Sequence, residues 1–299
     1  MKKAYRFGIE IECNVPTGNY TEFKRQVQAI GCETAGDGSI HADSDQEGIE
    51  IKTPPMGFNR LARTLTKIEK LCETNNVEVN RSCGLHVHVS NKRFYIVKNL
   101  RRIALLWVAI EDVLFATQPE SRLNNQYCQR KLKHYITNGL PTLPHDKDSL
   151  VRELGSTDRY YALNFASLAR HGTIECRLHA GTTSAKKIIY WAKLLQSIYT
   201  YALERYDEKA VSALFEKKTD ENKIKKTWDI LTLDTAHKTY LNARIQKFML
   251  PKLGAQQEAA VKAMKLQPTK QSVTKRYQNI REELDSIRHE EEILLRAFA

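Results

Sequence analysis

The sequence predicts an α+β fold, in which a mainly antiparallel sheet has helices covering one face and an all-helical C-terminal region follows. Four segments alternate between apolar and polar side chains with a period of two, as half-buried strands do, and apolar helical stripes separate them. From about residue 210 the chain has many Lys, no strand pattern and a single Gly, Gly254. We therefore expect two domains, residues 1–208 and residues 209–299.

The composition is that of an ordinary globular protein, with 41% hydrophobic and 27% charged residues in a chain of 299. The net charge of +12 fits a well-solvated basic surface, and nucleic acid as a partner is possible but not favoured. The six cysteines form no C-x-x-C pair, which is typical of reduced thiols. Because no long apolar run and no signal-peptide core are visible, we expect a cytoplasmic protein that does not enter the membrane.

The first alternating segment places two carboxylates on one face of a strand. Over residues 7–13 the apolar side chains point one way, whereas Gly8, Glu10 and Glu12 point the other way. The two carboxylates lie about 7 Å apart, so they repel unless a cation lies between them. A solvated strand face is the ordinary interpretation, and a site for Mg²⁺ or Mn²⁺ is the alternative. A helix is expected next, over residues 20–30.

Two short strands are expected over residues 39–43 and 48–53, joined by an acidic loop that includes Asp43. In the second strand Glu50 alternates with two Ile residues, so that it shares a face with Lys52. An amphipathic helix is expected over residues 58–75.

The segment over residues 84–90 carries His86, His88 and Ser90 on the polar face of a strand. A lone His in a strand is usually a packed residue. Two on one polar face favour a ligand role, because imidazole is the commonest neutral metal ligand. A long apolar helix is expected over residues 94–117.

A polar stretch over residues 118–150 is long enough for a functional lid or binding loop. Strands are expected over residues 159–165 and 172–179. The polar face of the latter carries Thr173, Glu175, Arg177 and His179.

Further helices are expected over residues 184–207, 220–232, 234–250, 255–264 and 268–298. Apolar residues in the last of these follow 4-3 spacing, which indicates a helix that packs on its own chain or forms a coiled-coil dimer. A homo-oligomer formed through the C-terminal helices is therefore one expectation.

The four strands together predict an open sheet face that is crowded with acids. Its expected members are Glu10, Glu12, Glu50, His86, His88, Glu175 and Arg177. So many carboxylates do not share one concavity without cations. Two metal ions close together would resolve the repulsion and would suit phosphate chemistry.

These segments, in this order, resemble the amidoligase family, a branch of the glutamine synthetase-like carboxylate–amine ligases. The resemblance covers roughly residues 5–205 and rests on residues 8–12, residues 48–55, residues 84–90, and Asn164 with residues 173–178. It implies a fold like the glutamine synthetase catalytic domain. It also implies an ATP- and Mg²⁺-dependent (or Mn²⁺-dependent) ligase that joins a small-molecule or peptide carboxylate to an amine through an acyl phosphate.

The resemblance also implies roles for individual residues. Glu10, His86 and Glu175 match one metal group, and Glu12, Glu50 and Asp43 match the other. His88 and Ser90, together with Arg81 and Asn164, are expected to bind the nucleotide. Arg177 is expected near the transferred phosphate, with Glu175 and Glu50 also in catalytic positions. The chain lacks the separate small N-terminal domain of glutamine synthetase and has no P-loop.

Two other functions remain open at this point. A metal-dependent hydrolase could use the same acid and His face to activate water, although an Arg beside Glu175 suits phosphate better. A non-catalytic basic module for nucleic acid or protein is supported by the charge alone.

Overall fold

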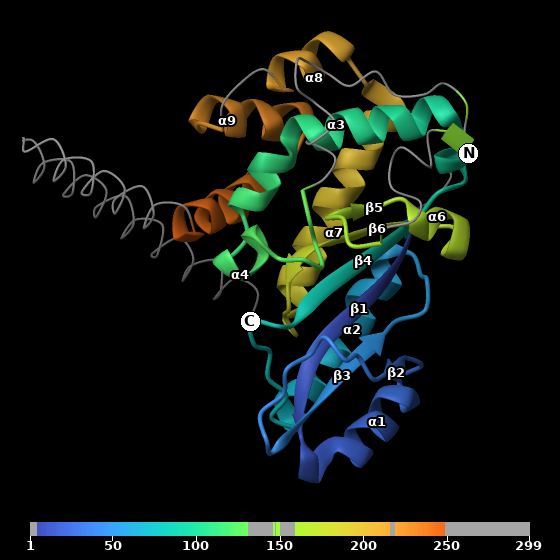
Figure 1. Ribbon diagram of the computed structural model, residues 1–299, viewed down its shortest axis with the longest axis vertical. Helices are drawn as coiled ribbons and strands as arrows, with labels where there is room; N and C mark the ends of the chain where they lie inside the picture. Colours follow the sequence, from blue (N-terminus) through green and yellow to red (C-terminus); the bar gives the residue numbers. More distant parts are fainter. Residues whose placement is uncertain (1–4, 131–145, 147, 150–158, 216–218, 249–299) are drawn as a thin grey trace, which may run out of the picture. The chain divides into compact units, whose positions relative to one another are not determined.

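A computed structural model describes residues 5–130, 146, 148–149, 159–215 and 219–248. Its centre is a six-stranded sheet in the order β2-β3-β1-β4-β6-β5, and every neighbouring pair is antiparallel (Figure 1). The strands are β1 (Arg6–Pro16), β2 (Glu33–Ala35), β3 (Gln46–Lys52), β4 (Gly84–Ser90), β5 (Leu163–Asn164) and β6 (Ile174–Ala180). The predicted antiparallel sheet is thus confirmed.

Helices cover the apolar face of this sheet. The main helices are α1 (Tyr20–Ala29), α2 (Phe58–Thr74), α3 (Val97–Ala116) and α7 (Ala185–Thr200), and α2 and α7 run behind the sheet in Figure 1. The apolar side chains of β1, such as Ile9 and Ile11, are fully buried, as are Leu61 and Ile68 on the inner stripe of α2. No helix in the described ranges is long and apolar enough to cross a membrane.

Further helices are described outside this main set. They are η1 (Thr17–Asn19), η2 (Lys92–Tyr95), α4 (Glu120–Leu123), α6 (Ala166–His171), the π-helix η4 (Tyr201–Arg205), α8 (Glu208–Phe215), α9 (Glu221–Ile230) and a helix over residues 235–248. Both α8 and α9 contact α3, within one compact unit that spans residues 1–248. The domain boundary at 208/209 stays a prediction, and the helices expected over residues 255–264 and 268–298 lie outside the described residues.

The strand expected over residues 39–43 is wrong. The carboxylate of Asp37 accepts hydrogen bonds from the backbone N–H and the hydroxyl of Ser39, at 2.8 and 2.7 Å, and so forms a local turn. The edge strand is instead β2, which pairs with β3 through residues 33–35. The strand expected over residues 159–165 is shortened to β5.

A β-bulge interrupts the pairing of β4 with β6. Leu85 pairs with His179 and Val87 pairs with Cys176, so two residues of β6 oppose the single residue His86. The extra residue turns His179 to the apolar face, where its ring lies 5.0 Å from that of Trp191 on α7. His179 was expected beside Glu175 on the polar face, and that expectation is wrong.

Candidate active site

The sheet register aligns the polar residues of neighbouring strands on the open face. Glu10 on β1 pairs with His86 on β4, and Glu12 pairs with Glu50 on β3. His88 pairs with Glu175 on β6, which in turn pairs with Asn164 on β5. We call Glu10, Glu12, Glu50, His86, His88 and Glu175 the acid–histidine face. All seven residues predicted for the open face, these six and Arg177, lie on one side of the sheet.

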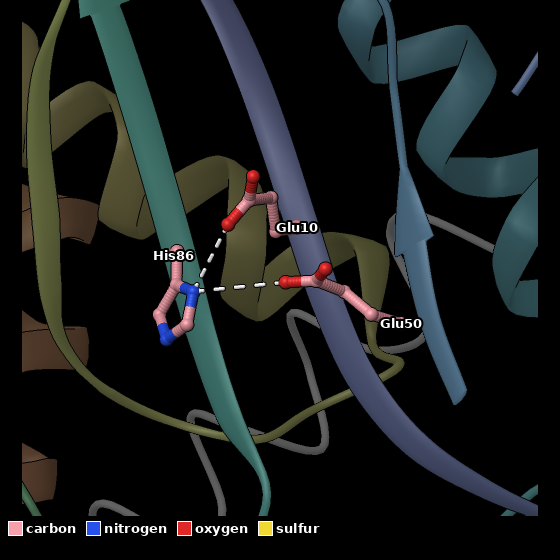
Figure 2. A group of neighbouring side chains, drawn as sticks. All are labelled: Glu10, Glu50 and His86. Carbon is pink, nitrogen blue, oxygen red and sulfur yellow. Dashed lines mark hydrogen bonds and ion pairs between the residues drawn. The ribbon is translucent and has the colours of Figure 1, made fainter. Parts of the chain in front are cut away.

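His86 lies among the carboxylates, as Figure 2 shows for its two neighbours Glu10 and Glu50. Its Nδ1 atom is 3.1 Å from Glu10 Oε2 and 3.9 Å from Glu50 Oε1. Its Nε2 atom is 3.3 Å from Glu12 Oε1. Gly84 leaves the room for this arrangement, because a Cβ there would lie 3.2 Å from His86 Nε2 and 3.3 Å from Glu12 Oε2.

Glu175 is held by two side chains from its own sheet. Arg177 donates from Nη1 to Glu175 Oε1 at 2.6 Å, and Asn164 donates from Nδ2 to Oε2 at 2.7 Å. Arg177 also donates from Nε to the carbonyl of Tyr127 at 3.1 Å. The guanidinium group is therefore fixed in direction by the loop that follows α4.

His88 is fixed by hydroxyl groups on its other side. Its Nδ1 atom lies 2.9 Å from Thr173 Oγ1 and 3.3 Å from Ser167 Oγ, and the two hydroxyls are 2.7 Å apart. This leaves Nε2 directed at the carboxylates, 3.4 Å from Glu10 Oε1, where it has no hydrogen-bond partner among the described residues.

These residues line a pocket of about 230 Å³. Its floor contains members of the acid–histidine face together with Asn164 and Ser167, and Asp37 also lines the pocket. Four cationic side chains also line it, namely Lys52, Arg159, Arg170 and Arg177, together with the imidazole of His171. The pocket thus presents carboxylates and cations to the same small volume.

The pKa directions reflect this crowding. Burial and the neighbouring Glu10 raise the pKa of Glu50 to about 6, although Lys52 opposes the shift. Burial also raises the pKa of Glu10, but the contacts of its carboxylate with His86 and His88 outweigh burial and hold that pKa well below its usual range. For Glu175, burial is outweighed by Arg177 and the two histidines, and the net pKa is lowered. Positive partners therefore decide which carboxylates stay ionised.

Three groups of side chains place their ligand atoms within 4.8 Å of one another. They are Glu10–Glu50–His86, Glu10–His88–Glu175 and Glu12–Asp37–Glu50. Carboxylate oxygens with one imidazole nitrogen suit Mg²⁺ or Mn²⁺. A divalent cation would also relieve the repulsion that raises the pKa of Glu50, so the donor set fits such an ion.

A family model supplies the comparison with known proteins. The model described as "putative amidoligase enzyme" matches residues 28–199, which is more than half of the chain. This chain belongs to the amidoligase family. Membership supports an amide-bond-forming enzyme as the general class.

No curated protein matches this chain. A crystal structure of a bifunctional glutathione synthetase from Pasteurella multocida is similar at a TM-score of 0.44 and 12% identity, over 82% of this chain and 47% of that chain. This chain therefore spans about half the length of that protein.

Four residues predicted for the site do not line the pocket. Glu12 is buried and contacts His86, but it is not part of the lining. Asp43 is exposed in the loop before β3, and Arg81 is exposed before β4. Ser90 ends β4 opposite Arg6 and does not line the pocket. Asp37, rather than Asp43, joins Glu12 and Glu50 in a candidate cation group. The functional assignments of all predicted site residues stay predictions.

Two residues that support the site were missed at the level of sequence. Arg122 on α4 is 2% exposed and donates to the carbonyls of Leu178 and Arg177 at 3.2 and 2.5 Å, at the bulge opposite His86. Asp37 lies between Gly36 and Gly38, a local pattern that indicates only a turn. An Arg in a polar loop carries no local signal of burial, so only the fold could reveal Arg122.

Proposed function

We propose that this protein is an ATP- and Mg²⁺-dependent carboxylate–amine ligase that forms an amide or peptide bond through an acyl phosphate. The substrates are a small-molecule or peptide carboxylate and an amine. The proposal includes a catalytic domain like that of glutamine synthetase. A cytoplasmic location and assembly through the C-terminal helices stay predictions.

The observation that carries the proposal is the packing of the acid–histidine face. Glu10, Glu50 and His86 bring ligand atoms within 4.8 Å of one another at the floor of a pocket, and Glu10, His88 and Glu175 do the same beside them. Divalent cations bound there would neutralise the charge of a triphosphate and of the phosphoryl group in transfer. Glu10, Glu12, Glu50, His86 and Glu175 are the residues that would hold them, and Asp37 is a further candidate.

The proposed reaction has two steps. First, an oxygen of the substrate carboxylate attacks the γ-phosphorus of ATP, the bond to the β-phosphate oxygen breaks, and ADP leaves. The amine nitrogen then attacks the acyl carbon of the acyl phosphate, inorganic phosphate leaves and the nitrogen loses a proton. Both steps depend chiefly on positioning and on charge neutralisation.

The chain's own residues supply that positioning. Arg177 is aimed into the pocket by Tyr127 and Glu175, and a planar guanidinium group can donate to two phosphate oxygens at once. Asn164 holds Glu175 from the other side. His88 is turned towards the floor by Thr173, so that it is available to a phosphate or a cation.

The test is a calorimetric titration of a non-hydrolysable ATP analogue into the full-length protein, with and without Mg²⁺. We expect binding that requires Mg²⁺ and is lost in Glu175→Gln, a variant of nearly equal size. Glu208→Gln is the matched control, because Glu208 is exposed at the start of α8, away from the pocket. A screen of amines and carboxylates for ADP release would then identify the substrates.

Two results would reject the proposal. Nucleotide binding that is unchanged in Glu175→Gln would separate ATP from the acid–histidine face. The absence of nucleotide binding with any divalent cation would favour a metal-dependent hydrolase on the same residues.

A further inference from the structure

The pocket has a cationic border that the proposed cation chemistry does not use. Arg159, Arg170 and His171 line the same pocket as Glu10 and Glu175. All three side chains are exposed to solvent, whereas Glu175 is buried. They belong to one stretch of chain, which enters β5, makes the short helix α6 and returns as β6. We call these three residues the cationic rim.

The cations of the pocket fall into two kinds. Arg177 and Lys52 are neutralised within the site, at 2.6 Å from Glu175 and 2.7 Å from Glu50. In the part of the chain that the structure describes, the side chain of Arg170 has no hydrogen bond or ion pair. Within the same limits, the side chain of Arg159 donates only to the hydroxyl of Tyr160, at 3.2 Å, and lies over that ring. Glu175 and Asp37 act on Arg159 only from a distance, so neither arginine is neutralised by an ion pair among the described residues.

The segment that carries the rim is fixed to the floor. Asn164 Oδ1 accepts from the backbone N–H of Ala166 at 2.9 Å, while Asn164 Nδ2 donates to Glu175. Ser167, which is 2% exposed, lies 2.7 Å from the hydroxyl of Thr173. Thr173 in turn contacts His88. Because buried hydrogen bonds tie the first turn of α6 to Asn164 on β5 and to Thr173 before β6, Arg170 and His171 are held beside the pocket.

We propose that the cationic rim is an oxyanion subsite, which binds a negatively charged phosphate or carboxylate group of the ligand. Guanidinium groups donate in pairs to the oxygens of such groups, and the rim faces an acidic floor that would repel an anion placed there. The inference deepens the proposed function, on which it rests: a triphosphate, or a substrate with a second carboxylate, would span from cations on the floor to the rim.

The two sources of the anion can be told apart with simple probes. Tripolyphosphate carries the phosphates of ATP without the nucleoside, and glutarate carries two carboxylates. Each is titrated calorimetrically into the full chain at low salt, with and without Mg²⁺. The variants are Arg170→Gln, Arg159→Gln and Arg170→Lys. The control is Arg63→Gln, an equal loss of charge at an exposed position on α2.

We expect at least one probe to bind, with Kd raised about tenfold or more in both Gln variants. We expect little change in Arg63→Gln and an intermediate value in Arg170→Lys. Binding of tripolyphosphate alone would assign the rim to the nucleotide, and binding of glutarate would assign it to the carboxylate substrate. If neither probe binds, or if Arg170→Gln binds as the wild type does, the inference is wrong.

This test is separable from that of the proposed function. In Mg²⁺-free buffer Glu175→Gln should keep its affinity for the anion, since Glu175 belongs to the floor. If the protein binds the anion but shows no Mg²⁺-dependent nucleotide binding, the ligase proposal is rejected. The assignment of the cationic rim as an oxyanion subsite then still holds.

Discussion

Arg177 and Glu175 lie two residues apart on the same face of β6 and form an ion pair of 2.6 Å within the pocket. Each partner has a second fixed contact, Tyr127 for the arginine and Asn164 for the carboxylate. The pair therefore links the loop after α4 to the short strand β5. It also keeps Glu175 ionised at the centre of a crowded group of acids.

Replacing Glu175 by Gln should abolish nucleotide-dependent activity while the protein stays folded. The change costs the ion pair with Arg177, but it also removes one of several neighbouring negative charges, and the amide oxygen can still accept a hydrogen bond from Asn164. Thermal unfolding in metal-free buffer is the measurement, and we expect one cooperative transition with a modestly lowered melting temperature. A large drop in that temperature would show that the carboxylate is structural.

Arg177→Lys should lose most of the activity, in spite of its conserved charge. A lysine has a single ammonium group and cannot reproduce the planar fork that contacts Tyr127 and Glu175 together. ADP release under saturating substrates is the measurement, with Arg63→Lys as the control on an exposed helix position. Near-normal turnover in Arg177→Lys would remove this residue from the mechanism.

Arg122→Met should destabilise the protein strongly, although Arg122 does not line the pocket. The carbonyls of Arg177 and Leu178 would lose their buried donor, at a cost of roughly 3 kcal/mol or more in the free energy of unfolding. Urea denaturation measures this loss. A change below about 1 kcal/mol would mean that water replaces the guanidinium group at the bulge.

Gly172→Ala should destabilise the turn between α6 and β6. Gly172 has φ of +69°, and a Cβ there would lie 2.9 Å from the hydroxyl of Tyr95. The left-handed conformation alone costs about 1–2 kcal/mol for a residue with a Cβ. Gly18→Ala is the control, since a Cβ at Gly18 meets no atom within 4 Å. Equal unfolding free energies for the two variants would contradict the prediction.

Stability should fall in mild acid because of His237. Burial lowers the pKa of His237 to about 4 from the usual 6.5, with Asp234 opposing and Lys193 adding to the shift. The unfolded chain therefore takes up a proton first, so the contribution is complete above pH 6.5 and is lost as pH falls towards 4.

Chemical denaturation across that range measures the effect, which amounts to roughly 3 kcal/mol for a shift of this size. We expect His237→Asn to flatten the slope and His41→Asn, at an exposed position, to leave it unchanged. An unaltered slope in His237→Asn would assign the acid sensitivity to other groups.

The local pattern of the sequence was enough to predict the strands and their polar faces. The alternation from Leu85 to Ser90 predicted the strand β4, and the alternation over residues 7–13 placed Glu10 and Glu12 on the open face. This works because the pleat of an extended backbone turns successive side chains to opposite sides wherever the strand lies in the fold. The same alternation in the other strands placed Glu50, His86 and Glu175 on that face as well.

The tertiary structure decided what local periodicity does not encode. The bulge opposite His86 moved His179 from the polar face to the core, and Arg122, from a distant loop, satisfies the carbonyls at that bulge. The turn around Asp37 brought that carboxylate to Glu12 and Glu50, whereas Asp43 stayed exposed. These outcomes depend on contacts between segments far apart in the chain, because a bulge or a buried charge is stable only when a remote partner completes its hydrogen bonds.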